Sequence, residues 1–341
     1  MLGLCIVGTG VAGEIAARAL QGETGGRLLA VVGSNPDKAR AFAEKWNVPR
    51  WYAGLDEALA DPDLLVMHIC TPPFLKASHT LQCARAGRHV MVEKPIARNV
   101  AEADEMIAAC EAAGVKLGCV FQHRFMPLPM KIKAAMEEGR LGRVFLGDAY
   151  VKWYRSEEYY RSGGWRATRD KEGGGALINQ AIHSIDLLQW LMGPAVEVIG
   201  RTATAFHQIE TEDLGVAIVR FQSGALGVIE GTTAAYPGFS ERIELHGDRG
   251  SVILNEGKEQ VEWYLRDQEP VVEGSDAELG YARNPASVSA AGHTAQFWDF
   301  YAAIQENRRP ALDGRGGRRA LEIIEAIYRS NRTGQPIPLP L

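Results

Sequence analysis

The chain begins with the sequence MLGLCIVGTGVAGEIAARAL, residues 1–20. The apolar run Leu2–Val7 is typical of a buried strand, and a helical pattern starts at Glu14. The strand and the helix are joined by a G-x-G-x-x-G motif made of Gly8, Thr9, Gly10, Val11, Ala12 and Gly13. The first glycine permits a tight turn, the second lets a ligand approach the backbone, and the third allows close helix–strand packing. This order predicts the opening unit of a Rossmann fold, with the pyrophosphate of a dinucleotide at the helix N-terminus.

Strand and helix patterns keep alternating beyond this motif, as far as Phe121. We predict further strands at Leu28–Val32, Leu64–Cys70, His89–Glu93 and Lys116–Phe121, and helices at Asp37–Trp46, His79–Ala86 and Ala101–Ala113. Such alternation is typical of a doubly wound α/β fold with a parallel sheet. We therefore assign residues 1–121 to a dinucleotide-binding Rossmann domain.

The pattern changes after Phe121, and residues 122–341 are assigned to a second α/β domain. A helix is predicted near Pro129–Glu138, an apolar one at Ala176–Met192, and two more near Thr294–Glu306 and Gly317–Asn331. Loosely alternating strands are predicted at Val144–Trp153, Val196–Ala205, Leu214–Phe221, Ala225–Thr232, Arg242–Gly247, Ser251–Leu254 and Val261–Leu265. Their tight, glycine-containing turns favour a mainly antiparallel sheet.

The composition excludes several classes of protein. The 341 residues carry a formal net charge of −5, and 46% are hydrophobic and 23% charged, as in ordinary globular proteins. Without a basic excess, we expect no nucleic-acid partner. The most apolar stretch, Leu64–Leu75, is interrupted by Pro72 and Pro73 and is too short to cross a bilayer, so we expect no membrane span.

The cysteines indicate a reducing compartment. There are five of them, an odd number, and none forms a Cys-x-x-Cys pair. We therefore expect neither a disulfide framework nor a metal site. Because the N-terminal sequence also lacks the basic region of a signal peptide, the expected location is the cytoplasm.

The residues after the second predicted strand bear on the choice of cofactor. NAD-binding Rossmann domains usually place an acidic residue here, whereas this chain has Gly33 followed by Ser34 and Asn35. The missing acid removes a charge that would repel a 2′-phosphate, and Ser34, Lys38 and Arg40 could bind that phosphate. The sequence thus favours NADP over NAD, with NAD possible; alternatively, Ser34 and Asn35 merely cap the next helix.

Two motifs follow strands at the sheet edge where open α/β sheets bind ligands. Thr71, Pro72 and Pro73 follow the third predicted strand, and Glu93, Lys94 and Pro95 follow the fourth. Lys94 is well placed to reach a reacting oxygen, although a lysine considered alone is more often a surface charge. The remaining cofactor-binding candidates are His79 and Gln122.

A third constellation follows the glycine run 173–175. Asn179, His183 and Asp186 stand at i, i+4 and i+7 on an otherwise apolar helix, and such polar groups need partners or a cavity. His183 is therefore a candidate acid or base, oriented by Asp186 and assisted by Asn179; the alternative is a core histidine. Further substrate-binding candidates are His123, Arg124, Trp165, Arg166, Tyr236 and His293.

Taken together, these motifs resemble the Gfo/Idh/MocA family, the glucose–fructose oxidoreductase and inositol dehydrogenase group. The resemblance rests on 8–13, Thr71-Pro72, Glu93-Lys94-Pro95, 173–186 and 333–336. It implies a Rossmann domain followed by an α/β domain with a large open sheet, which often joins homodimers or homotetramers. It also implies that Lys94 contacts the reacting hydroxyl and that His183 exchanges its proton.

The resemblance further implies an NAD(P)-dependent oxidoreductase that acts on a carbinol carbon of a sugar, a sugar derivative or an inositol. Inositol-dehydrogenase-like members have an aspartate where this chain has Asn179. The Asn-Gln-Ala-Ile-His version is similar to members that oxidise position 3 of nucleotide-linked or other sugars. Alternatives are a redox-neutral glycosidase that uses NAD, a cofactor-sensing regulator on the same scaffold, and a structural oligomer without a ligand.

Overall fold

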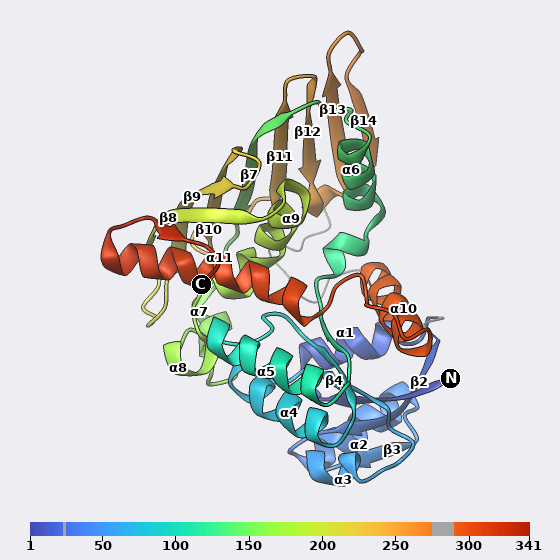
Figure 1. The fold of residues 1–341 in the computed structure, drawn as a ribbon. Helices are drawn as coiled ribbons and strands as arrows, with labels where there is room; N and C mark the ends of the chain where they lie inside the picture. Colours follow the sequence, from blue (N-terminus) through green and yellow to red (C-terminus); the bar gives the residue numbers. More distant parts are fainter. Residues whose placement is uncertain (23–24, 275–289) are drawn as a thin grey trace. The chain divides into compact units, whose positions relative to one another are not determined.

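The computed structural model describes residues 1–22, 25–274 and 290–341. The chain divides into two compact units (Figure 1). The first unit comprises Met1–Phe125 and Ser289–Arg318, and the second comprises Met126–Val288 and Arg319–Leu341.

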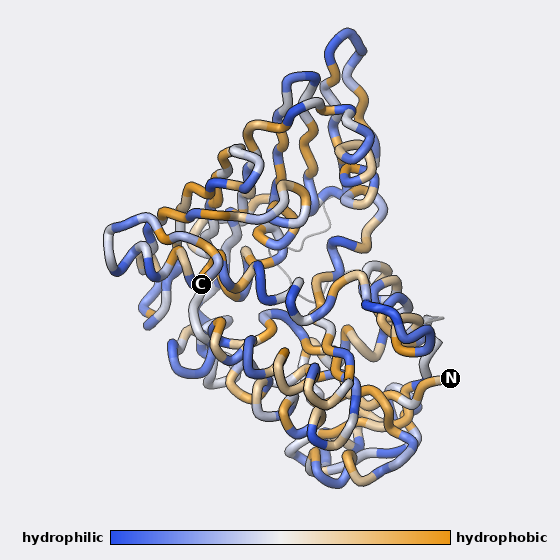
Figure 2. Tube along the Cα trace, in the orientation of Figure 1, coloured by the Kyte–Doolittle hydropathy of each residue, from blue (hydrophilic) through white to orange (hydrophobic). Residues whose placement is uncertain are grey.

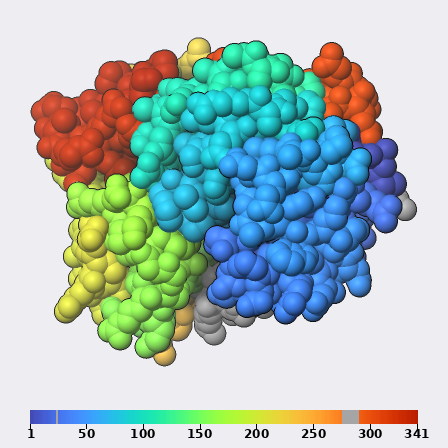
Figure 3. Space-filling model, turned by 90° about the horizontal axis from the view of Figure 1, so that it is seen from below, coloured from blue at the N-terminus to red at the C-terminus, as the bar shows by residue number. Residues whose placement is uncertain are grey.

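A parallel sheet of six strands forms the centre of the first unit, in the order β3-β2-β1-β4-β5-β6. The strands are β1 (Leu2–Val7), β2 (Gly26–Val32), β3 (Arg50–Tyr52), β4 (Val66–Ile69), β5 (His89–Val92) and β6 (Leu117–Cys119). The connecting helices are α1 (Val11–Ala19), α2 (Pro36–Trp46), α3 (Leu55–Leu59), α4 (Pro73–Arg85) and α5 (Val100–Ala112). The strand order reverses between β1 and β4, which is where doubly wound sheets bind their ligands. Neighbouring helices α4 and α5 form part of the unit's surface (Figure 3).

The strands of this sheet are apolar because helices cover both of its faces. Leu4, Ile6 and Val66 are fully buried, and the tube of Figure 2 is orange along these strands. The short strand β3 was not predicted from the sequence. It has three residues, and its central Trp51 is 41% exposed, so it lacks the apolar run of the other strands.

A late helix completes the core of the first unit. In α10 (Ala291–Gln305), Phe297, Phe300 and Tyr301 are buried in the same cluster as Leu4 and Ile6. The sequence analysis assigned all of 122–341 to one domain, whereas the chain returns to the first unit here. The cause is the apolar face of α10, which packs into the same core as the residues of the parallel sheet.

The second unit contains a nine-stranded sheet in the order β14-β13-β12-β11-β7-β10-β9-β8-β15. The strands are β7 (Val144–Lys152), β8 (Ala195–Ala203), β9 (Leu214–Phe221), β10 (Leu226–Thr232), β11 (Arg242–Gly247), β12 (Gly250–Asn255), β13 (Gln260–Leu265), β14 (Val271–Gly274) and β15 (Ile337–Pro338). All neighbours pair antiparallel except β7 and β10, which are parallel. The prediction of a mainly antiparallel sheet is thus confirmed.

Helices cover one face of this sheet. The helices of the unit are α6 (Pro127–Glu137), α7 (Glu157–Arg161), α8 (Arg169–Glu172), α9 (Ile182–Met192) and most of α11 (Gly314–Thr333). Helix α9 packs on β7 and β11, while α6 packs on β12. Along β9, buried and exposed residues alternate, with Val216 and Ile218 on the exposed face, so this other face of the sheet is left open by the described residues.

Within the described ranges, no helix is long and apolar enough to cross a membrane.

Candidate active site

The glycine-rich turn between β1 and α1 has the geometry that a dinucleotide requires. Gly8 has a φ of +118°, and a Cβ there would lie 2.8 Å from the Cys70 carbonyl oxygen. A Cβ on Gly13 would lie 2.2 Å from the Gly8 carbonyl oxygen, so both glycines are required by the chain itself. Gly10 is exposed, and a Cβ there would meet nothing within 4 Å. This glycine therefore leaves room for a ligand at the N-terminus of α1, and the turn fits a pyrophosphate.

At the end of β2, the candidates for 2′-phosphate binding divide into two groups. Ser34 and Lys38 are exposed. The Asn35 side chain caps α2, because its Oδ1 accepts a hydrogen bond from the Lys38 backbone N–H at 3.0 Å. Arg40 lies 3.8 Å from Asp37 and also pairs with Glu44. Ser34 and Lys38 are thus the better candidates for contacting a phosphate.

The Thr-Pro-Pro segment lies after β4, directly beside β1 in the sheet. Thr71 and Pro72 are half-buried, and Pro73 is buried at the start of α4. The Thr71 hydroxyl lies 3.3 Å from Nδ1 of His79, one of the predicted cofactor-binding residues. Burial lowers the pKa of His79, which favours the neutral ring.

The loop that carries Lys94 is held by a buried lysine that the sequence analysis missed. Lys76, on α4, donates hydrogen bonds to the Glu93 carbonyl at 2.6 Å and to the Pro95 carbonyl at 2.8 Å. Lys94, half-buried, is the residue between these two carbonyls. Burial lowers the pKa of Lys76 to about 8, although the nearby Glu93 carboxylate opposes this shift. Burial likewise raises the pKa of Glu93.

The segment after β6 contains three further candidates in one turn of 3₁₀ helix, residues Gln122–Phe125. Gln122 is buried, and His123 and Arg124 are half-buried. The segment is fixed by Gln296 of α10, which accepts from the Phe121 N–H at 3.1 Å and donates to the Cys119 carbonyl at 2.7 Å. His293 is buried one helical turn before Gln296.

In the second unit, the predicted helix 176–192 consists of two parts. A π-helix forms Leu177–Ala181, and α9 follows from Ile182. Asn179 lies in the π-helix and His183 in the first turn of α9; both side chains are half-buried, whereas Asp186 is buried. The predicted single α-helical face is therefore interrupted, because a π-helix has hydrogen bonds of i→i+5. Such π turns are frequent at functional sites.

The start of this helix is held by Glu212, a second buried carboxylate. It accepts hydrogen bonds from the N–H groups of Gly175 at 2.9 Å and Leu177 at 3.0 Å, and from the Tyr328 hydroxyl at 2.7 Å. A Cβ on Gly175 would lie 2.0 Å from the Glu212 carbonyl oxygen, so this position accepts only glycine. Burial raises the pKa of Glu212, and the three hydrogen bonds oppose that shift.

Trp165 and Arg166 belong to an aromatic cluster that also includes Tyr159 of α7. The Arg166 guanidinium lies 4.5 Å from the Trp165 ring centre and 4.4 Å from that of Tyr159. The Tyr159 hydroxyl accepts from Arg166 and from Gln180, each at 2.8 Å. These contacts fix the orientation of the Arg166 guanidinium. A guanidinium is the group that would bind a carboxylate or a phosphate.

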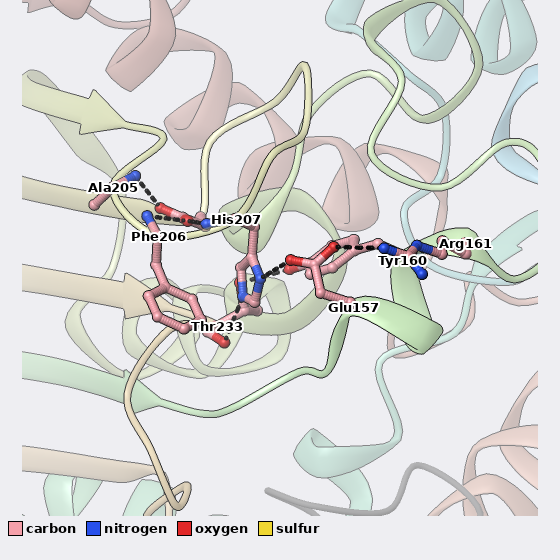
Figure 4. A network of polar contacts seen from close by, with 8 residues as sticks. Glu157, Tyr160, Arg161, Ala205, Phe206, His207 and Thr233 are labelled. Carbon is pink, nitrogen blue, oxygen red and sulfur yellow. Dashed lines mark hydrogen bonds and ion pairs between the residues drawn. The ribbon is translucent and has the colours of Figure 1, made fainter.

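Another polar network surrounds His207 (Figure 4). One ring nitrogen lies 3.3 Å from the Glu157 carboxylate and the other 3.2 Å from the Thr233 carbonyl oxygen. The N–H groups of residues 205–207 donate to Asp213 at 2.6–2.8 Å.

The predicted substrate-binding residue Tyr236 is 77% exposed, and its ring makes an edge contact with the ring of Tyr154.

The predicted site residues thus fall into two sets. The cofactor-binding candidates, with Lys94, His123, Arg124 and His293, belong to the first unit. Trp165, Arg166, Asn179, His183 and Tyr236 belong to the second. Sequence analysis missed Lys76, Glu172, Glu212 and Tyr159, and only Glu172, which directly precedes the glycine run, had a position that could have drawn attention.

Within the described residues, no group of three His, Cys, Asp or Glu side chains could hold a metal ion.

Two family models match the chain. The model described as "Oxidoreductase family, NAD-binding Rossmann fold" matches residues 2–121, and the "GFO/IDH/MocA C-terminal domain" matches residues 130–253. A 1,5-anhydro-D-fructose reductase of Ensifer adhaerens is 28% identical over 321 residues, 92% of this chain and 91% of that relative. A myo-inositol 2-dehydrogenase of Thermotoga maritima is 29% identical over 266 residues, 74% of this chain and 75% of the relative.

A solved structure is also similar over the whole chain. It is the WlbA dehydrogenase from Bordetella pertussis, in complex with NADH and UDP-GlcNAcA. The two chains are 32% identical, the match covers 100% of this chain and 98% of that one, and the TM-score is 0.87.

Proposed function

Because the chain belongs to the Gfo/Idh/MocA family of oxidoreductases, with an NAD-binding Rossmann fold, we propose that it oxidises or reduces a sugar-like substrate. The reaction exchanges hydride between the nicotinamide of NAD(P) and a carbinol carbon of a sugar, a sugar derivative or an inositol. The observation that carries the proposal is the glycine turn, where Gly10 leaves open space at the N-terminus of α1 while Gly8 and Gly13 are required by the backbone.

His183 and Lys94 are the proposed catalytic residues. A bound nicotinamide supplies the hydride acceptor or donor. When a carbinol is oxidised, the hydroxyl proton has to leave as the carbonyl forms, and a neutral His183 is the group that takes it. The proposed role of the Lys94 ammonium is to stabilise negative charge on the reacting oxygen.

The proposed substrate is rich in hydroxyl groups and includes nucleotide-linked sugars among the candidates. Asn179 and the clustered Trp165 and Arg166 offer hydrogen bonds and a guanidinium for such a molecule. The relative from Bordetella pertussis was solved with UDP-GlcNAcA, a nucleotide-linked sugar acid. A site built to bond hydroxyl groups rejects analogues that lack them.

The test is a substrate panel followed through the absorbance of reduced nicotinamide. The panel contains UDP-GlcNAcA, myo-inositol, glucose and a simple aliphatic alcohol, each with NAD⁺ and NADP⁺, and 1,5-anhydro-D-fructose in the reductive direction. We expect turnover with at least one polyhydroxylated compound. Turnover of the aliphatic alcohol alone would refute the proposal. Release of free sugar from nitrophenyl glycosides without net reduced nicotinamide would instead indicate the glycosidase, and cofactor binding without any turnover would indicate a regulator.

We also propose that NADP(H) is preferred to NAD(H). None of residues 33–36 directly after β2 is acidic, and Ser34 and Lys38 are exposed near that strand's end. Ser34→Asp would place a negative charge against the 2′-phosphate, and two like charges about 4 Å apart repel by roughly 1–4 kcal/mol. We expect the KM for NADP⁺ to rise about tenfold or more, with a much smaller effect on NAD⁺. The control is Ser223→Asp, because Ser223 is also an exposed serine and lies in the second unit.

A preference of the wild type for NAD⁺ would overturn this assignment. Gly33→Asp is a less specific test, because a Cβ at Gly33 would already lie 3.0 Å from Cγ2 of Thr9 and 3.2 Å from Cβ of Ala39.

Finally, we propose a homodimer or homotetramer joined through the open face of the second unit's sheet. Ile199, Val216, Ile218 and Leu226 are 37–52% exposed there. Burial of such apolar side chains favours association. Sedimentation of the wild type and of Ile218→Lys should show an assembly that the charge dissociates; a monomeric wild type would refute it.

A further inference from the structure

The carboxylate of Glu172 contacts Asn179, although the proposed function gives Glu172 no role. Glu172 is the last residue of α8 and is 3% exposed. The next residue, Gly173, has a φ of +91° and turns the chain into the glycine run. Seven residues after Glu172, the Asn179 side-chain amide donates a hydrogen bond from Nδ2 to Oε1 of Glu172.

The other oxygen of the same carboxylate holds the turn next to Arg166. Oε2 of Glu172 accepts a hydrogen bond from the Ala167 backbone N–H. Ala167 has a φ of +56°, which is uncommon for a residue with a side chain. Glu172 therefore connects the turn after Trp165 and Arg166 with the π-helical turn that carries Asn179.

The burial of Glu172 and the groups that face it together set its pKa. Burial raises the pKa of Glu172 to about 7. The bonds from Ala167 and Asn179 and the Arg166 guanidinium oppose this rise, whereas the Glu212 carboxylate adds to it. The hydroxyls of Tyr159, Tyr160 and Tyr328 also feel the charge of Glu172, which favours their neutral forms. Both protonation states of Glu172 are then present at physiological pH.

We propose that Glu172 is a positioning residue whose protonation state fixes the direction of the Asn179 amide. This inference rests on the proposed function, because it takes Asn179 as a substrate-binding residue. An ionised carboxylate can only accept hydrogen bonds, so it holds Nδ2 of Asn179 toward itself. A protonated carboxyl can donate to Oδ1, which lets the amide turn round. The hydrogen-bonding character that Asn179 presents to a substrate hydroxyl therefore changes with pH.

The first experiment follows the two side chains by NMR and requires no turnover. The carboxyl carbons of glutamate and the side-chain amides of asparagine are isotopically labelled, and Glu172→Gln and Asn179→Ala assign the two signals. We expect the Glu172 carboxyl and the Asn179 amide to titrate with one midpoint near pH 7. In Glu172→Gln, the Asn179 amide should no longer titrate there. A Glu172 midpoint in the ordinary carboxyl range, or an Asn179 amide unaffected by it, would overturn the inference.

The second experiment separates positioning from a merely structural role. With the best substrate of the panel, we expect KM of the wild type to change severalfold between pH 6 and pH 8, with a midpoint near 7, and kcat to change less at that midpoint. Glu172→Gln should remove this midpoint from KM and leave the other pH dependence of kcat in place. Asp170→Asn, which neutralises an exposed acid on the same helix, should behave as the wild type.

The two proposals can fail separately. If the proposed function is wrong, the wild type turns over no member of the panel, and the NMR titration still decides about Glu172. If this inference is wrong, the wild type turns over a sugar but its KM has no midpoint that Glu172→Gln removes.

Discussion

Glu172 should reduce the stability of the folded protein as the pH rises. Its pKa in the fold is about 7, against an ordinary value of 4.5 that applies to the unfolded chain. The native state therefore holds a proton that the unfolded state has lost between these two values. Because stability falls with pH wherever the native state binds more protons, the wild type becomes less stable across this window. Glu172→Gln keeps the size of the side chain and removes the titration.

The magnitude follows from the shift. At about 1.4 kcal/mol per pKa unit, the change from 4.5 to about 7 amounts to roughly 3 kcal/mol in full. Of this, about 2.5 kcal/mol falls between pH 5 and pH 8. The free energy of unfolding of the wild type relative to Glu172→Gln should decrease by about that amount over this range.

The assay is equilibrium urea unfolding of the wild type, Glu172→Gln and the exposed control Asp170→Asn at pH 5, 6, 7 and 8. In the Gln variant, the hydrogen bond from the Ala167 N–H no longer has a charged acceptor. This lowers the free energy of unfolding of the variant by an amount that does not depend on pH. The informative quantity is therefore the slope with pH. A difference between wild type and Glu172→Gln that stays within about 0.5 kcal/mol from pH 5 to pH 8 would refute the reasoning.

Three further predictions follow from the contacts. His183→Ala and Lys94→Ala should each lower turnover by ~10²-fold or more and spare cofactor binding; near-normal turnover with an unchanged pH profile would contradict the assignment. Lys76→Met removes both hydrogen bonds that hold the carbonyls flanking Lys94, so kcat should fall about tenfold and the melting temperature should drop; an unchanged kcat would deny it a positioning role. Gly10→Ala should fold normally but bind cofactor at least tenfold more weakly, whereas Gly13→Ala should lose roughly 1–3 kcal/mol of stability through its clash with the Gly8 carbonyl, as cofactor titration and thermal unfolding would show.

Local signals explain why much of the fold could be predicted from the sequence. The β1–turn–α1 unit is encoded by an apolar run, three spaced glycines and a helical pattern within a short segment. Strands β9 and β11 were predicted with the bounds that the structure shows, since each is a regular run between turn residues. Nothing local indicated that α10 joins the first unit, because an apolar helix face does not specify which sheet it covers.

The candidate site was only partly predictable for a related reason. Lys94 and His183 stand in recognisable motifs, whereas Lys76 looks like a surface lysine in the sequence. In the fold it is buried and donates hydrogen bonds to two carbonyls of the loop that carries Lys94. The contact between Glu172 and Asn179 depends on the left-handed Gly173 and on a π-helical turn, and neither is encoded by helical periodicity. Spacing placed Asn179 and His183 on one α-helical face, which the π-helix interrupts.

The buried charged groups in the two units raise the same physical question. Burial shifts the pKa of Lys76 down and those of Glu93, Glu172 and Glu212 up, so each shift marks a cost of keeping the charge. Apolar residues of similar size would often be more stable in such places. Three of these four groups, however, hold backbone or an amide beside a candidate site residue. Lys76 binds the two carbonyls that flank Lys94, Glu172 binds the Asn179 amide, and Glu212 binds the N–H groups at the start of the helix that carries Asn179. A stability cost concentrated beside the residues that would do the chemistry is what positioning requires, and it explains why Glu172→Gln should gain relative stability at high pH while losing the pH dependence of KM.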